Sequence, residues 1–260
     1  MAGTEVFMRA YVFEPREKRQ MALSNELENA GIEPHFVDED FFETGLAPLT
    51  QPGHETRAIL IGESPNIHDQ IRAIRRAGCE NPVIVLRDFR NSQDTSAALD
   101  RGADDVIVSP IKGSEVASRI NSIVRRFHGH AAESVEVGEL VAFFDGRDPI
   151  VSGARIKLSK REHSIFQHLA LNSNKVISKN AIYDAVYGMS PDQPFDKVID
   201  VYICKLRKKI AAAAASGAQY IETVHGRGYK LSAPEQLELP VPEIQPAPRA
   251  GHGASYQARA

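Results

Sequence analysis

Short runs of consecutive apolar residues in the first half of the chain are the feature that most constrains its fold. Residues 58–61 read AILI, and residues 83–86 read VIVL. A strand that is apolar at every position is buried on both faces, which is typical of a parallel sheet covered by helices. Amphipathic segments separate these runs, as in NIHDQIRAIRR over residues 66–76, where isoleucines recur at intervals of four and three. We therefore expect an α/β unit with a doubly wound sheet of five parallel strands.

The elements predicted for this unit alternate between strand and helix. Two of the helices are expected to close at glycines, because Gly31 and Gly78 follow the last residues of their apolar stripes. The segment between the second and third strands has no clear pattern and is expected to be a loop. The expected strands span residues 6–13, 34–38, 58–61, 81–88 and 105–109, and the expected helices span residues 15–31, 66–78, 94–101 and 114–127.

The pattern changes after residues 128–134, which lack periodicity and which we interpret as a linker. Beyond it, short strands interrupted by Asp-Gly and Ser-Gly pairs predict a small antiparallel sheet, and two strands around a His-Gly-Arg-Gly turn predict a hairpin. Residues 233–260 contain five prolines and are expected to form a disordered tail. The predicted domains span residues 1–127 and 135–232, and the predicted helices of the second domain span Lys160–Leu171, Ser178–Tyr187 and Phe195–Ala215.

Composition and charge narrow the class of protein. No apolar run approaches the ~20 residues that a membrane-spanning helix requires, and the N-terminal residues lack a signal-peptide pattern. Two cysteines make no disulfide framework and fit a reducing cytoplasm. The histidines and cysteines have no metal-ligand spacing, and no Ser-His-Asp arrangement or phosphate-cradling glycine loop indicates an enzyme. We therefore expect no membrane association, no metal or cofactor, and no catalytic activity.

The predicted helix FDKVIDVYICKLRKKI carries the strongest indication of function. Isoleucine and leucine recur along it at intervals of four, three and four, which predicts one buried stripe. The other face is basic with a central tyrosine and valine, a combination that suits the major groove of DNA. A solvated basic face is an equally probable interpretation of this helix alone. The candidate DNA-binding residues of the helix are Lys197, Val201, Tyr202, Lys205, Arg207 and Lys208.

The predicted hairpin shifts the balance toward DNA binding. Its turn reads His225-Gly226-Arg227-Gly228, which places an arginine at a glycine-flexible tip that can enter a narrow minor groove. An ordinary exposed turn residue is the alternative interpretation of Arg227. A basic helix together with an arginine-tipped hairpin is much less often accidental than either feature alone.

The segments LSKREHSIFQHLALNSNKVISKNAIYDAVYG, IDVYICKLRKKI and YIETVHGRGYKL closely resemble the winged-helix domain of OmpR/PhoB response regulators. The resemblance covers about residues 135–232. It implies a recognition helix over residues 195–210, a wing over residues 220–231, and binding to tandem half-sites on double-stranded DNA. It also implies that the loop Gly188–Pro194 contacts RNA polymerase, and that the protein is a bacterial cytoplasmic transcription regulator found at the nucleoid when bound.

The same resemblance implies that the first unit is a receiver, yet the chain departs from the receiver pattern at nearly every functional position. Receivers use an acidic pair for Mg²⁺, an aspartate that accepts the phosphoryl group, a hydroxyl residue and a lysine. Here Glu14 is kept, but a proline, a glycine, an arginine and a serine stand at the other positions. These four departures are Pro15 in the acidic pair, Gly62 at the nucleophile, Arg87 at the hydroxyl and Ser109 at the lysine. We therefore predict a regulator that works without aspartyl phosphorylation.

Several interpretations of this altered pocket remain open. Glu63 is a candidate for a permanent negative charge that contacts Arg87 and mimics a phosphorylated state. We favour a solvated turn residue instead, because successive side chains of a strand point to opposite faces. An ion pair between Arg87 and Glu14 is a further possibility. The alternative function is a sensor in which the altered pocket binds a metabolite or a partner protein.

Dimerisation through the receiver is also predicted from the resemblance. Asp104, Asp105 and Arg119 match members of the charged network on the face formed by the fourth helix, the fifth strand and the fifth helix. The fourth helix lacks the basic residues that complete this network in the family. We expect a homodimer through this face, in which the receiver serves as a dimerisation module.

Overall fold

The apolar runs of the first half form a five-stranded parallel sheet in the computed structural model, which describes residues 8–50, 57–187 and 197–234. The strand order is β2-β1-β3-β4-β5, and every neighbouring pair is parallel. The predicted doubly wound sheet is therefore confirmed. Its strands are β1 (Met8–Phe13), β2 (Ile32–Phe36), β3 (Ala58–Ile61), β4 (Val83–Arg87) and β5 (Asp105–Val108).

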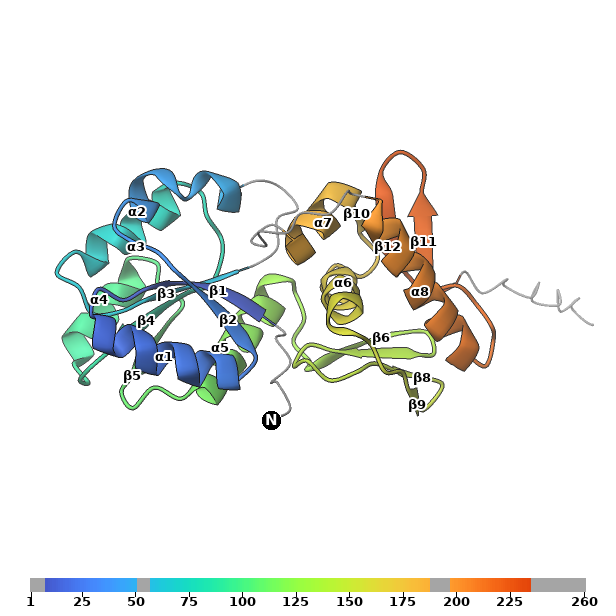
Figure 1. Cartoon of the computed structure of the whole chain (residues 1–260), viewed down its shortest axis with the longest axis horizontal. Helices are drawn as coiled ribbons and strands as arrows, with labels where there is room; N and C mark the ends of the chain where they lie inside the picture. Colours follow the sequence, from blue (N-terminus) through green and yellow to red (C-terminus); the bar gives the residue numbers. More distant parts are fainter. Residues whose placement is uncertain (1–7, 51–56, 188–196, 235–260) are drawn as a thin grey trace, which may run out of the picture.

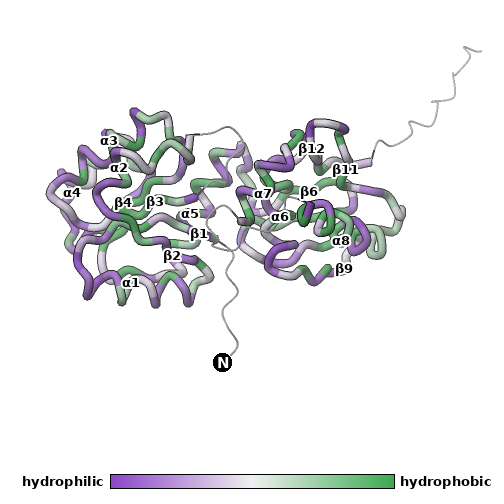
Figure 2. The backbone as a smooth tube through the Cα atoms, turned by 45° about the horizontal axis from the view of Figure 1, so that its top comes forward, coloured by the Kyte–Doolittle hydropathy of each residue, from purple (hydrophilic) through white to green (hydrophobic). Residues whose placement is uncertain are grey.

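Helices cover both faces of this sheet (Figure 1). Along β3, Ile59 and Ile61 belong to the core beneath α2 and α3, whereas Leu60 belongs to the core beneath α1 and α5. Burial on both faces explains why the central strands are apolar at every position, and Figure 2 shows hydrophobic residues concentrated there. The helices are α1 (Glu17–Asn29), α2 (Phe41–Thr44), α3 (Ile67–Arg76), α4 (Ser92–Asp100) and α5 (Gly113–Phe127).

Part of the segment expected to be a loop between the second and third strands is helical. It contains α2 and a short 3-10 helix over Ala47–Thr50. Phe41 and Phe42, together with two leucines further on, are buried against the sheet. The prediction of a loop was wrong here because these segments are too short to display a helical period. Helix α4 also begins two residues before the expected start, where the side chain of Asn91 accepts hydrogen bonds from two backbone N–H groups of its first turn.

The second half forms two small antiparallel sheets around three helices. The predicted sheet near residue 135 has four strands, and the predicted hairpin is extended to three strands by a short strand that the sequence did not reveal. Helix α8 ends two residues before the predicted Ala215, and the predicted start at Phe195 lies outside the described residues. The elements are β6 (Ser134–Val137), β7 (Leu140–Phe143), β8 (Ile150–Val151), β9 (Ala154–Arg155), α6 (Lys160–Leu171), β10 (Val176–Ile177), α7 (Lys179–Tyr187), α8 (Val198–Ala213), β11 (Ile221–Val224) and β12 (Gly228–Leu231).

The core of this second unit orients α8. Its predicted stripe is buried as expected, with Ile199, Ile203, Leu206 and Ile210 each at most 2% exposed. The opposite face of α8 and the β11–β12 hairpin lie on the side of the unit remote from the parallel sheet (Figure 1). Within residues 8–50, 57–187 and 197–234, no helix is long and apolar enough to span a bilayer.

Candidate nucleic-acid interface and receiver pocket

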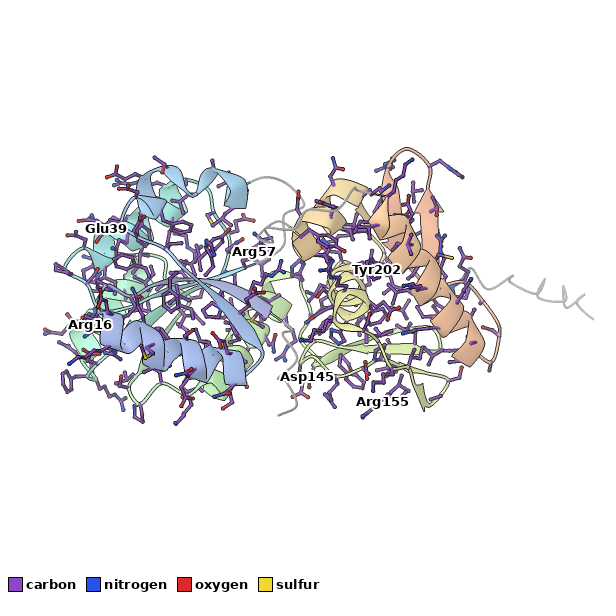
Figure 3. The ribbon with its side chains drawn as sticks, viewed as in Figure 1. Arg16, Glu39, Arg57, Asp145, Arg155 and Tyr202 are labelled. Atoms are coloured by element: carbon purple, nitrogen blue, oxygen red, sulfur yellow. The ribbon has the colours of Figure 1, made fainter. Side chains whose placement is uncertain are left out.

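The exposed face of α8 gathers most of the residues predicted to bind DNA. Lys197, Lys205 and Lys208 are exposed, and Val201 has 52% of its surface accessible although it is apolar. Tyr202, labelled on α8 in Figure 3, is half-buried. The ammonium of Lys205 lies 5.4 Å from the centre of its ring, which is within range of a cation–π interaction. The face therefore presents lysines beside one apolar and one aromatic side chain.

Arg207 differs from the other predicted residues in where its side chain lies. Its Nε donates to the carbonyl of Ile221 at 2.8 Å, and its Nη2 donates to the hydroxyl of Thr223 at 2.7 Å. Both acceptors belong to β11, so the guanidinium of Arg207 ties α8 to the hairpin. Because these hydrogen bonds hold the side chain against the hairpin, Arg207 is placed to position the hairpin beside α8.

Asp200 connects three elements around the hairpin, a role that sequence analysis missed. Its carboxylate accepts a hydrogen bond from the Tyr229 hydroxyl at 2.6 Å and forms an ion pair with Lys179 at 2.9 Å. Burial and the neighbouring Asp200 raise the pKa of Tyr229 to about 12. The hydrogen bond from Tyr229 in turn lowers the pKa of Asp200. Asp200 thus joins α8 to α7 and β12. Because Asp200 and Tyr229 are 29 residues apart, their contact leaves no periodic signal in the sequence.

The tip of the hairpin is exposed, as expected for a DNA-contacting turn. His225 and Arg227 are both exposed, and Gly226 between them has a φ of +70°, which favours glycine. A cavity of about 360 Å³ lies between this tip and the start of α7, where Ser178, Lys179 and Asn180 line it. Polar and cationic groups of the hairpin and of the start of α7 therefore face one opening.

The carboxyl ends of the parallel strands form the second region of interest, around Gly62. The residue follows β3, and a Cβ atom added there would lie 2.6 Å from Oε2 of Glu14. Glu14 is only 2% exposed. The space above the glycine is therefore filled by the carboxylate of Glu14, which reaches across from the end of β1.

Arginines from the start of α1 neutralise that carboxylate. Arg16 Nε donates to Glu14 at 2.7 Å and its Nη1 bonds Asp88 at 2.5 Å. Arg19 also pairs with Asp88, lies 3.8 Å from Glu14, and donates to the hydroxyl of Ser109 at 2.8 Å. The hydrogen bond to Glu14 raises the pKa of Arg16. We call Glu14, Arg16, Arg19 and Asp88 the Glu14 network. Ser109 stands where receivers carry a lysine. Arg19 of this network, from α1, supplies a positive charge next to it.

Glu63 forms an ion pair with Arg87, so the favoured interpretation of a solvated turn residue was wrong. That interpretation assumed that strand alternation continues past Gly62, whereas β3 ends at Ile61 and the backbone turns there. The suggested ion pair between Arg87 and Glu14 is also absent from the ion pairs of the described residues, because Glu14 is held by Arg16 and Arg19. The backbone N–H of Asp88 lies 3.4 Å from Glu63 as well.

Comparison with known proteins assigns the chain to a family. Residues 153–231 match the model of the family described as transcriptional regulatory protein, C terminal. The cell cycle response regulator CtrA of Brucella anthropi is 37% identical over 168 residues, which cover 65% of this chain and 72% of that protein. The chain belongs to the OmpR/PhoB family of response regulators. It is a DNA-binding transcriptional regulator of this type, and the predicted resemblance of its second domain to the winged-helix domain of this family is confirmed.

Two of the solved structures similar to this regulator are a response regulator and a DNA-binding domain. DrrB of Thermotoga maritima, an OmpR/PhoB homologue, is 21% identical, with a TM-score of 0.38, and the match covers 87% of this chain and all of that chain. The DNA-binding domain of Klebsiella pneumoniae RstA, in complex with the RstA box, is 25% identical with a TM-score of 0.33. That match covers 39% of this chain and 98% of the RstA chain.

The receiver pocket of this regulator does not fit the Mg²⁺ ion that phosphorylation in the family requires. A hard cation needs carboxylate oxygens that are free to coordinate it. Of the acidic pair only Glu14 remains, and both of its oxygens accept hydrogen bonds from the guanidinium of Arg16. Among the described residues there is no group of three or more His, Cys, Asp or Glu side chains placed to hold a metal.

The three residues predicted for the dimer face form contacts within the chain. Asp105 and Arg119 are ion-paired at 2.6 Å, and Arg119 also bonds Glu115. Asp104 instead accepts from Arg75 and from the backbone N–H of Val83, both at 2.7 Å. Asp105 and Arg119 thus lie together on the predicted face, whereas the carboxylate of Asp104 joins α3 to the start of β4.

Proposed function

We propose that the regulator binds DNA by placing the exposed face of α8 in the major groove and Arg227 of the wing in the adjacent minor groove. The observation that carries this proposal is the exposed basic face around Val201, beside a wing held by Arg207 and Asp200. Lysines there suit phosphates or guanine edges, and an exposed valine suits a thymine methyl group. The residues proposed to contact DNA are Lys197, Val201, Tyr202, Lys205, Lys208 and Arg227, with Arg207 holding the wing.

We further propose that this regulator acts without aspartyl phosphorylation. Gly62 has no side chain to accept a phosphoryl group, and the carboxylate of Glu14 fills the space above it. Arginines hold that carboxylate and Asp88, and Arg87 pairs with Glu63. The pocket is thus neutralised by its own residues, which supports a receiver whose conformation is fixed at all times.

In this proposal the receiver serves as a dimerisation module. The pair of Asp105 and Arg119 on the predicted face supports an interface formed by α4, β5 and α5. Two chains paired there would bring two winged-helix domains to tandem half-sites in the cytoplasm. The predicted contact with RNA polymerase through Gly188–Pro194 lies outside the described residues and remains part of the proposal.

The alternative function, a pocket that senses a metabolite or partner, has narrower support. Nε of Arg87 is buried and has no hydrogen-bond partner among the described residues, which favours an anionic ligand. Against this, the three arginines around the pocket are already paired with three carboxylates. A ligand would have to displace one of these ion pairs. The DNA-binding dimer is therefore better supported than the ligand-sensing function.

The substitution Lys205→Ala is expected to weaken DNA binding by about tenfold and to reduce the salt slope by about 0.9 if the lysine contacts a phosphate. The reason is that each neutralised phosphate releases condensed counterions. Fluorescence anisotropy of the full chain on its operator, measured over a salt series, gives both quantities.

The matched control is Lys18→Ala, which removes the same charge from an exposed position on α1 of the receiver. The control is expected to bind like the unsubstituted protein. Equal affinity and salt slope for both variants would contradict the assignment of α8 as the recognition helix.

A further inference from the structure

The amino ends of the receiver strands contact the winged-helix domain through a buried arginine. Arg57, just before β3, is 2% exposed. Its Nη2 donates to the carbonyl of Asp184 in α7 at 2.8 Å, and its Nη1 lies 3.4 Å from the hydroxyl of Tyr11 in β1. Figure 3 labels Arg57 at the junction of the two units and Arg16 at the far end of the sheet. The domain contact and the altered pocket therefore lie at opposite ends of the same strands.

A second arginine of the receiver reaches the same helix. Arg9 in β1 donates through Nη1 to the carbonyl of Val186 at 3.0 Å. Its Nε pairs with Glu33 of β2 at 3.0 Å, which holds the guanidinium in place. Arg9 of β1 and Arg57, which directly precedes β3, thus each supply one cation to the last turn of α7.

The segment between the domains makes an equivalent contact with α6. The Nε2 of His130 donates to the carbonyl of Leu171, the last residue of α6, at 2.8 Å. The His130 ring also packs on Phe144, with ring centres 4.7 Å apart. Leu171 itself packs against apolar clusters of both domains. Although predicted to be a linker, this segment is bound to the winged-helix domain at His130.

These contacts share one physical basis. The last four carbonyl groups of a helix have no partner within the helix, and they form the negative end of its dipole. All three carbonyls, those of Asp184, Val186 and Leu171, belong to such last turns. Helix α7 has no basic residue in its own last turn. The donors to these three carbonyls come from outside the helices, and two of the three come from the receiver.

We propose that Arg9, Arg57 and His130 are positioning residues that dock the winged-helix domain on the receiver in one fixed orientation. In this orientation α8 and the wing face away from the receiver, so docking leaves the DNA-binding surface open (Figure 1). In the absence of DNA, the two domains of one chain then behave as one rigid body. This inference goes beyond the proposed function, because it concerns the domain arrangement and is testable without DNA.

Pulsed electron spin resonance on the full chain tests the docking. One spin label is attached to the native Cys204, which is exposed on α8, and a second to Ala22→Cys, exposed on α1, while Cys79 is buried. The doubly labelled protein with Arg9, Arg57 and His130 intact is expected to give a single narrow distance distribution. Combining Arg9→Gln with Arg57→Gln is expected to broaden that distribution at least twofold, because glutamine is shorter and uncharged and the carbonyls of α7 lose their cationic donors.

Two controls separate positioning from loss of folding or of charge. Arg76→Gln removes an exposed charge at the end of α3 and is expected to leave the distribution narrow. With Arg9 intact, Arg57→Lys keeps a donor and the charge. Its distance distribution is therefore expected to be narrower than that of Arg57→Gln. If the double variant fails to fold, Arg9→Gln combined with His130→Ala takes its place. A broad distribution in the unsubstituted protein, or a narrow one in a folded double variant, would overturn the proposal.

Discussion

Replacing Gly62 by aspartate, the residue that receivers carry at this position, is expected to destabilise the protein by about 3 kcal/mol and not to restore a phosphorylation site. A Cβ atom there would lie 2.6 Å from Oε2 of Glu14 and 3.0 Å from the carbonyl oxygen of Phe13. Glu14 is buried and held by Arg16, so it cannot move aside without breaking that ion pair. The carboxylate of the introduced aspartate would also lie close to that of Glu14, and the two negative charges would repel each other. Urea unfolding of the full chain measures the loss.

A double-mutant cycle shows whether the clash with Glu14 is the cause. Gly62→Ala adds only the Cβ atom, and Glu14→Ala removes the carboxylate that it would meet. We expect Gly62→Ala to cost less in the Glu14→Ala background, by about 1 kcal/mol or more, because the space is then open. Strict additivity of the two substitutions would show that Glu14 does not fill the pocket in solution.

Replacing Gly228 by alanine is expected to cost about 3 kcal/mol or more and to abolish specific DNA binding. A Cβ atom at this position would lie 2.0 Å from the carbonyl oxygen of Ile177, and the φ of Gly228 is +135°. The contact is with backbone, so no side chain can move to relieve it. Strand β12 must then separate from β10, which displaces Tyr229 from Asp200 and loosens the wing. Thermal unfolding and operator binding measure the two effects.

Gly226→Ala is the matched control in the same turn. Gly226 also has a positive φ, +70°, but nothing lies within 4 Å of the position of its Cβ. The control is expected to cost only about 1 kcal/mol, the strain of a left-handed backbone for alanine, and to keep DNA binding. If the two variants were equally stable, close packing of the wing against β10 would not be needed for the fold.

The fold was largely predictable because its signals are local. Apolar runs such as residues 58–61 indicate strands buried on both faces, and the stripe beginning at Ile199 indicates the buried side of α8. The elements that the sequence did not predict are short. The strand Val176–Ile177 has two residues and is defined only by its pairing with β12. The helix Phe41–Thr44 is a single turn. Elements of this length carry no measurable period.

The candidate sites were predictable in position and less so in contacts. The glycine at residue 62 marked a pocket without a nucleophile, yet the arginines that fill it come from the start of α1. Arg16 and Arg19 stand two and five residues after Glu14, so their charges were visible in the sequence. Their direction was not, because it depends on how α1 packs beside β1. The contact between Arg57 and Asp184 spans 127 positions and leaves no trace in any single segment.

The central claim is that this regulator binds DNA independently of aspartyl phosphorylation. Its most direct test is the affinity of the full chain for its operator, measured before and after incubation with acetyl phosphate and Mg²⁺. A regulator with an aspartate at the usual position serves as the control that the donor is active. We expect an unchanged affinity, within about twofold, because Gly62 offers no acceptor and the Glu14 network already fills the pocket. Tightening by about tenfold or more would contradict the account.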